Sequence, residues 1–127
     1  MDLSKSASAG FAIAIALAAT MVPAVPSGQK GKGSVRFAEV SQILQANCVS
    51  CHNAKSHPAD VDLSSYDAVM NSGGDDPIVI PKHPEQSRIV AFVDGTKKPR
   101  MPFRKPPLSG DQIDLVKRWI KAGAKSQ

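Results

Sequence analysis

Two cysteines and a histidine within residues 48–52 are the part of this chain best suited to chemistry. Cys48 and Cys51 are the only cysteines in the 127-residue sequence, and His52 follows them directly. Thiols at this spacing can reach the two vinyl groups along one edge of a haem and form thioethers with them. The adjacent imidazole can then ligate the iron. The C-x-x-C-H pattern therefore predicts one covalently attached haem c, with His52 as an iron ligand.

The same pattern permits other chemistries. Paired cysteines also occur in dithiol redox sites and in zinc sites. A thioredoxin-like site would follow a strand in an α/β pattern, and no such pattern surrounds Cys48. Structural zinc takes about four ligands, and His57 and His83 could complete a set begun by the two cysteines and His52. However, no second C-x-x-C pair follows. Haem is the favoured interpretation, and a zinc-stapled interaction module is an alternative.

A haem iron held by one histidine has a sixth position to fill, and Met101 is the best candidate for it. It lies in residues 97–102, where two prolines stiffen the chain and lower the entropic cost of holding a thioether over the iron. An axial methionine raises the reduction potential relative to a second histidine. Three other residues could serve instead, but one is expected in the core and two at the surface: Met70, His57 and His83.

The first residues have the pattern of a secretory leader. An apolar run covers residues 11–22, follows Lys5, and precedes small residues that suit cleavage after Ala24 or Ser27. The run fits the core of a signal peptide and is too short to span a membrane. We predict a signal peptide over residues 1–27, with an uncleaved N-terminal anchor as the alternative. Export to the periplasm or another extracytoplasmic compartment would place the cysteines where covalent haem attachment occurs.

The remainder is long enough for one domain. Residues 28–34 are rich in glycine and predict a flexible linker, and residues 35–127 predict a single monohaem domain. A domain of this size has a limited core, and aromatic residues make up only 5% of the sequence. A buried porphyrin would supply much of the missing apolar volume.

Four segments are predicted to be helical, which indicates an all-α domain with long connections. The first three cover about residues 34–46, 65–71 and 85–93, each with apolar residues on one face. The fourth begins with a capping box at Ser109 and Gln112 and ends at a glycine, Gly123. Prolines bound the apolar run Ile78-Val79-Ile80 on both sides, so we expect an extended loop there rather than a strand.

The order of these elements resembles a class I c-type cytochrome: a helix, C-x-x-C-H, a methionine loop and a final helix. The details resemble the small planctomycete-type cytochrome c domain and cover roughly residues 35–124. They lie in the segments 37–52, 62–66, 80–89, 101–102 and 108–124.

This resemblance implies a cytochrome c-like fold with Cys48 and Cys51 as the thioether sites. It implies His52 as the proximal and Met101 as the distal iron ligand. It also implies that the first and last helices cross, with Phe37 near Trp119. The chain departs from the family pattern in having Asn53 where glycine is usual and Phe103 where a second proline is common.

Charge indicates the kind of partner. The formal net charge is +5, and five basic residues bracket Met101: Lys97, Lys98, Arg100, Arg104 and Lys105. Such a group would steer the protein towards a redox partner with an acidic surface. It could equally be a solvated loop or pair with haem propionates. Nucleic-acid binding is not expected, because the predicted export would place the protein in the wrong compartment for it. Membrane contact is expected only with an uncleaved leader.

Together these features predict a one-electron carrier with His/Met-ligated haem iron, in a periplasmic or extracytoplasmic electron-transfer chain. Two axial ligands would keep substrates off the iron, and no residue resembles a general base or nucleophile, so no catalysis is expected. The alternative with haem is an open-site protein, peroxidase-like or gas-sensing, in which Met101 does not bind the iron.

Overall fold

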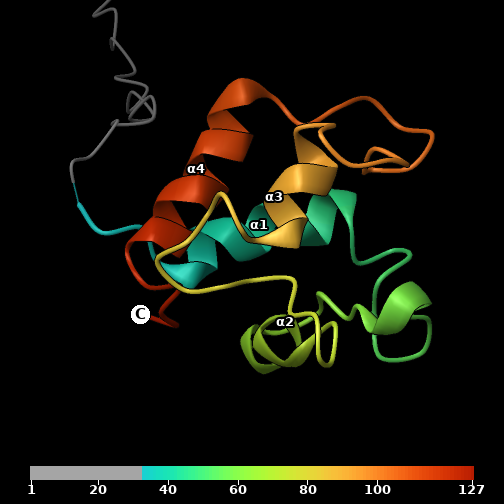
Figure 1. The fold of residues 1–127 in the computed structure, drawn as a ribbon, viewed down its shortest axis with the longest axis horizontal. Helices are drawn as coiled ribbons and strands as arrows, with labels where there is room; N and C mark the ends of the chain where they lie inside the picture. Colours follow the sequence, from blue (N-terminus) through green and yellow to red (C-terminus); the bar gives the residue numbers. More distant parts are fainter. Residues whose placement is uncertain (1–32) are drawn as a thin grey trace, which may run out of the picture. The chain divides into compact units, whose positions relative to one another are not determined.

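The computed structural model describes residues 33–127, which contain four α-helices and no β-strand. The helices are α1 (Phe37–Asn47), α2 (Tyr66–Asn71), α3 (Arg88–Val93) and α4 (Gly110–Lys121), with one 3-10 turn, η1 (Pro58–Asp60) (Figure 1). The all-α prediction is confirmed. The predicted signal peptide and most of the predicted linker lie outside the described residues. None of the helices within residues 33–127 is both long and apolar enough to cross a membrane.

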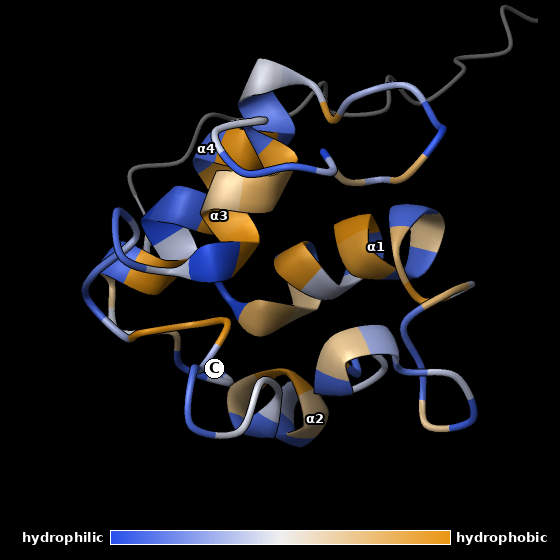
Figure 2. Ribbon diagram, turned by 45° about the vertical axis from the view of Figure 1, so that its right-hand side comes forward, coloured by the Kyte–Doolittle hydropathy of each residue, from blue (hydrophilic) through white to orange (hydrophobic). Residues whose placement is uncertain are grey.

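The first and last helices pack through an aromatic cluster. The ring centroids of Phe37 and Trp119 lie 5.5 Å apart, and those of Phe37 and Tyr66 lie 5.3 Å apart in an edge-on arrangement. The polar tips are satisfied, because the Trp119 indole donates to the Lys125 carbonyl and the Tyr66 hydroxyl donates to the Ala124 carbonyl. Figure 2 shows further apolar residues gathered where α1, α3 and α4 approach one another. The expected contact between Phe37 and Trp119 is confirmed.

Helix α4 forms as the sequence predicts. The Ser109 hydroxyl accepts a hydrogen bond from the Gln112 backbone, and the Gln112 side chain accepts one from the Ser109 backbone. Gly123, just beyond the helix, has φ +108°, a conformation that glycine adopts without strain. The buried stripe consists of Val116, Trp119 and Ile120.

Two helices begin later than predicted. Helix α1 starts at Phe37 rather than residue 34, because Arg36 has an extended backbone and the preceding Val35 is buried in the core. Helix α3 starts at Arg88 rather than residue 85. The buried Ser87 hydroxyl accepts from the Ile80 amide and donates to the His83 carbonyl, which stabilises a turn over residues 83–87.

The connections pack on the core rather than forming a sheet. Ile78 and Val79 are buried in a loop, as expected, and the Ile78 carbonyl accepts a hydrogen bond from the Ile89 amide. The turn η1 was not predicted. It begins at Pro58, whose missing amide hydrogen costs nothing at the start of a helical turn.

Candidate haem site

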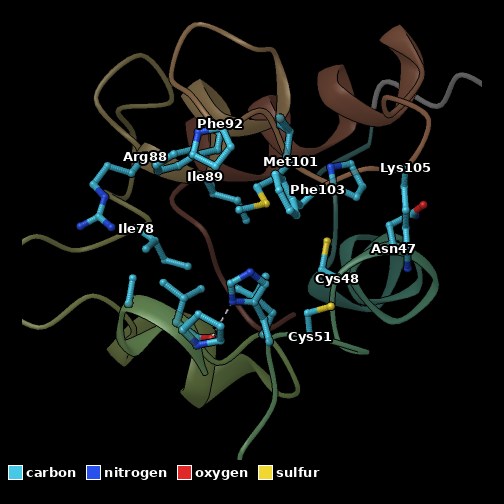
Figure 3. A pocket seen from close by; sticks show the side chains of 18 residues that line it. Asn47, Cys48, Cys51, Ile78, Arg88, Ile89, Phe92, Met101, Phe103 and Lys105 are labelled. Atoms are coloured by element: carbon cyan, nitrogen blue, oxygen red, sulfur yellow. Dashed lines mark hydrogen bonds between the residues drawn. The ribbon is translucent and has the colours of Figure 1, made fainter. Parts of the chain in front are cut away.

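A cavity of about 420 Å³ lies between the C-x-x-C-H turn, η1, α3 and the loop before α4 (Figure 3). This volume is in the range usual for small-molecule and cofactor sites. Apolar side chains form most of its wall: Pro58, Ala59, Val61, Leu63, Ile78, Ile89, Phe92, Val93, Pro99, Pro102 and Phe103. The remaining lining residues are Asn47, Cys48, Cys51, His52, Arg88, Met101 and Lys105.

The C-x-x-C-H segment continues directly from the end of α1. The Cys48 amide donates to the Leu44 carbonyl, and the Cys48 carbonyl accepts hydrogen bonds from the amides of Cys51 and His52. This single turn places the two thiols and the imidazole on the same cavity. Both cysteines are free thiols, and Figure 3 shows their sulfur atoms on one side of the cavity. The arrangement suits attachment along one edge of a planar group.

The imidazole of His52 is oriented by the backbone. Its Nδ1 atom lies 3.1 Å from the Val61 carbonyl oxygen. Because a carbonyl can only accept a hydrogen bond, this contact assigns the proton to Nδ1 and leaves the lone pair on Nε2. A second bond, from the Leu63 amide to the His52 carbonyl, joins the same two segments. Nε2 is therefore the nitrogen free to bind a metal.

Met101 reaches the same cavity from the loop between α3 and α4. The Met101 amide donates to the Phe92 carbonyl over 2.9 Å, and the Lys97 amide donates to the Ala91 carbonyl over 2.8 Å, so the loop is held against α3. Figure 3 shows the Met101 sulfur atom directed into the cavity. Met101 is half-buried.

The other candidates for a sixth ligand do not line this cavity. Met70 packs against the hydrophobic core. His57 is exposed before η1, and the His83 side chain, 52% exposed, pairs with Glu85 through a 3.1 Å contact. The structure thus brings Met101, and none of these three, to the cavity that holds His52. The roles of Cys48, Cys51, His52 and Met101 as haem ligands and attachment points stay predictions.

Two cations, Arg88 and Lys105, also line the cavity. The sequence analysis named Lys105 among the basic residues around Met101 but did not identify Arg88. The Arg88 guanidinium lies 2.7 Å from a carboxylate oxygen of Asp76 and donates to the Asp76 carbonyl, and its side chain is only 17% exposed. The Lys105 ammonium donates to the Ser50 hydroxyl over 3.3 Å. A basic residue opening the apolar helix Arg88–Val93 is the signal that could have indicated a cation facing the cavity.

The thiol environment does not favour dithiol redox chemistry. Burial raises the pKa of the Cys48 thiol to about 11; the Lys105 charge opposes this shift, and Cys51 adds to it. Reactive cysteines have lowered rather than raised pKa values. For zinc, residues 33–127 contain no group of three or more His, Cys, Asp or Glu side chains placed to hold a metal ion. The thiols, the imidazole and the thioether around an apolar cavity fit the groups that a haem with one histidine and one methionine ligand would need.

Comparison with known proteins agrees with this chemistry. Residues 48–103 match the family model described as Planctomycete cytochrome C. The matched segment begins at Cys48 and extends through α2, α3 and Met101. Neither the curated proteins nor the solved structures searched gave a match to the chain. The match confirms the resemblance seen in the sequence: residues 48–103 are similar to the planctomycete-type cytochrome c family, and the all-α structure is consistent with a cytochrome c-like fold.

Proposed function

We propose that this protein is a monohaem c-type cytochrome that carries one electron at a time. The observation that supports this most strongly is the convergence of four residues on one apolar cavity: Cys48, Cys51, His52 and Met101. They supply two thiols, an imidazole with one nitrogen already engaged, and a thioether. The cytochrome family match of residues 48–103 supports the same conclusion.

Each residue has a distinct part in the mechanism. Cys48 and Cys51 would hold the haem covalently, and His52, through Nε2, and Met101 would ligate its iron. When bound, the haem supplies an iron centre that accepts and releases one electron. Met101 would raise the reduction potential of that centre relative to a second histidine.

The apolar wall and the two cations complete the site. Apolar side chains form most of the cavity wall and would limit the access of water to a bound haem. Arg88 would pair with a carboxylate of the haem, and Asp76 would keep the guanidinium in place through the 2.7 Å contact. Lys105 lines the same cavity beside Ser50 and offers a second cation.

We propose a carrier rather than an enzyme. With His52 and Met101 both serving as iron ligands, a substrate could reach the iron only by displacing one of them. We further propose that the carrier works in a periplasmic or extracytoplasmic electron-transfer chain, where the predicted leader would deliver it. Covalent haem attachment takes place on that side of the membrane, so leader and motif agree.

The test is a visible spectrum of the full chain made with haem-maturation machinery. Sharp bands in the reduced state and a weak far-red band in the ferric state, the signature of methionine ligation, are expected. Met101→Ala should abolish the far-red band, whereas the matched control Met70→Ala should retain it. A high-spin spectrum of the parent protein would support an open-site haem protein instead. Stoichiometric zinc without haem would overturn both haem interpretations.

A further inference from the structure

Two polar residues are buried within residues 33–127: Ser72, which is 4% exposed, and Ser87. Ser87 stabilises the turn that precedes α3. Ser72 lies just after α2 and does not line the cavity. A buried hydroxyl needs hydrogen-bond partners, and Ser72 finds them in the part of the chain that holds His52.

The Ser72 hydroxyl bonds to both backbone groups of one distant residue, Asp62. It accepts a hydrogen bond from the Asp62 amide over 2.8 Å. Its own proton is shared between two carbonyl oxygens, that of Asp62 at 2.9 Å and that of Ala68 at 2.8 Å. No backbone acceptor for the Asp62 amide is found between residues 33 and 127, so the serine hydroxyl is its partner.

The chain between η1 and α2 presents one edge to His52 and the other to Ser72. On the first edge, the Val61 carbonyl oxygen lies 3.1 Å from Nδ1 of His52, and the Leu63 amide donates to the His52 carbonyl. Val61 is extended, and in extended chain the backbone groups of neighbouring residues point in opposite directions. The backbone groups of Asp62 therefore face away from His52, towards Ser72. The hydroxyl takes the place of a neighbouring strand.

An ordinary helical serine would not make these bonds. A serine at the end of a helix often bonds only to the carbonyl four residues earlier, here that of Ala68. That bond needs no contact with Asp62. The next residue along the chain also ties α2 to the same segment, because the Gly73 amide donates to the Asp60 carbonyl over 3.0 Å.

We propose that Ser72 is a positioning residue for His52. Through the backbone of Asp62, its hydroxyl holds the Val61 carbonyl against the imidazole, and so adjusts how strongly that imidazole would donate to a haem iron. This inference rests on the proposed function, since it concerns the histidine side of the same site.

The hydrogen bond at Nδ1 influences the basicity of the other ring nitrogen. A firm bond to a carbonyl makes the imidazole a stronger donor, and a stronger donor favours ferric over ferrous iron. Ser72 would touch neither the haem nor the iron. Its influence would be carried by the backbone of Val61 and Asp62, which lies between the hydroxyl and the ring.

The first test is Ser72→Ala, which removes the hydroxyl from both Asp62 backbone groups. In the reduced holoprotein, exchange of the His52 Nδ1 proton with solvent should become about tenfold faster or more, because unpaired buried backbone groups favour local opening. NMR measures this rate. The weakened bond should also raise the reduction potential, measured by redox titration, while the far-red methionine band remains.

Ser65→Ala is the matched control, because it removes a serine hydroxyl from the other end of the same helix. The Ser65 hydroxyl accepts from the Ala68 amide at the start of α2, so its loss also destabilises that helix. In this variant the exchange rate and the potential should both stay close to those of the parent. Equal changes in the two alanine variants would reduce Ser72 to a residue that stabilises α2, and would overturn the proposal.

Two further measurements do not depend on the alanine variant. Ser72→Thr retains a hydroxyl and should keep the exchange rate and the potential near the parental values. In the parent itself, the Asp62 amide should exchange slowly, as its bond to a buried hydroxyl requires. An Asp62 amide that exchanges as fast as that of the exposed Ala54 would contradict the proposal even if Ser72→Ala failed to fold.

Failure of this proposal differs from failure of the proposed function. A parent protein without a haem spectrum would refute the carrier function. A haem-loaded parent in which Ser72→Ala leaves the His52 proton and the potential unchanged would refute only the role of Ser72.

Discussion

The Nδ1 atom of His52 lies 3.1 Å from the carbonyl oxygen of Val61, nine residues further along the chain. This contact joins the residue that follows the two cysteines to the segment after η1. It also determines which ring nitrogen carries a proton, because the carbonyl has no hydrogen to give. The backbone of Val61, a residue with no reactive side chain, thus determines which nitrogen of His52 is left free to bind a metal.

The first prediction concerns that proton. In the reduced holoprotein, NMR should show an Nδ1 proton on His52 that exchanges slowly and has a close contact to the residues around Val61. The physical reason is that a hydrogen bond to a half-buried carbonyl protects the proton from solvent. A signal on Nε2 instead would contradict the assigned tautomer.

The second prediction concerns the start of α4. Ser109→Ala removes the hydroxyl that accepts the Gln112 amide, and should lower the free energy of unfolding by about 1 kcal/mol. The loss is measured by denaturant unfolding of the holoprotein. Ser126→Ala, at an exposed position near the end of the chain, is the control and should change stability little. Equal effects of the two substitutions would show that the capping box does not stabilise the helix.

The third prediction concerns Arg88. Removing this cation in Arg88→Leu should lower the reduction potential, since a nearby positive charge favours ferrous over ferric iron. A haem carboxylate that loses its cation also has a higher pKa. The pH range in which the reduction potential falls as the pH rises should therefore shift to higher pH.

Redox titrations over a pH series measure both effects. Arg88→Lys keeps the charge but not the planar guanidinium, and should restore the potential in part. An unchanged pH dependence in Arg88→Leu would show that Arg88 does not pair with a haem carboxylate.

The fourth prediction concerns Asp94, at the end of α3. Hydrogen bonds from the Thr96 side chain and backbone lower the pKa of its carboxyl group below 3.8, with a smaller contribution from the Lys117 charge. A lowered pKa in the folded state means that the carboxylate stabilises the fold above the unfolded-state pKa. That stability is lost as the pH falls through the folded-state value.

Asp94→Asn should therefore reduce the free energy of unfolding near neutral pH and have little effect in strong acid. Unfolding experiments on the holoprotein across the acid range test this. Asp75→Asn makes the same charge change at an exposed position and serves as the control. A loss of stability for Asp94→Asn that is independent of pH would contradict the electrostatic explanation.

The features that could be predicted from the sequence are those that depend on contacts between residues close together in the chain. The capping box of α4 depends on residues three positions apart, and the C-x-x-C-H turn on residues within five positions, so both could be identified in advance. The extended segment at Ile78 followed from its flanking prolines. The match of residues 48–103 to a cytochrome family agrees with the motif-based prediction of haem attachment.

The features that sequence reasoning missed depend on distant contacts. Helix α3 begins late because Ser87 is buried and bonded to Ile80, which no propensity of residues 85–87 indicates. The place of Arg88 at the cavity involves Asp76, twelve residues earlier. The turn η1 passed unnoticed because a single helical turn carries too few residues for a periodic pattern.

The hydrogen bond between Lys105 and Ser50 spans fifty-five residues of sequence and closes the chain around the cavity. Lys105 lines the cavity on the loop that carries Met101, and Ser50 lies between the two cysteines in sequence. This one bond therefore ties the attachment turn to the methionine loop at the edge of the site.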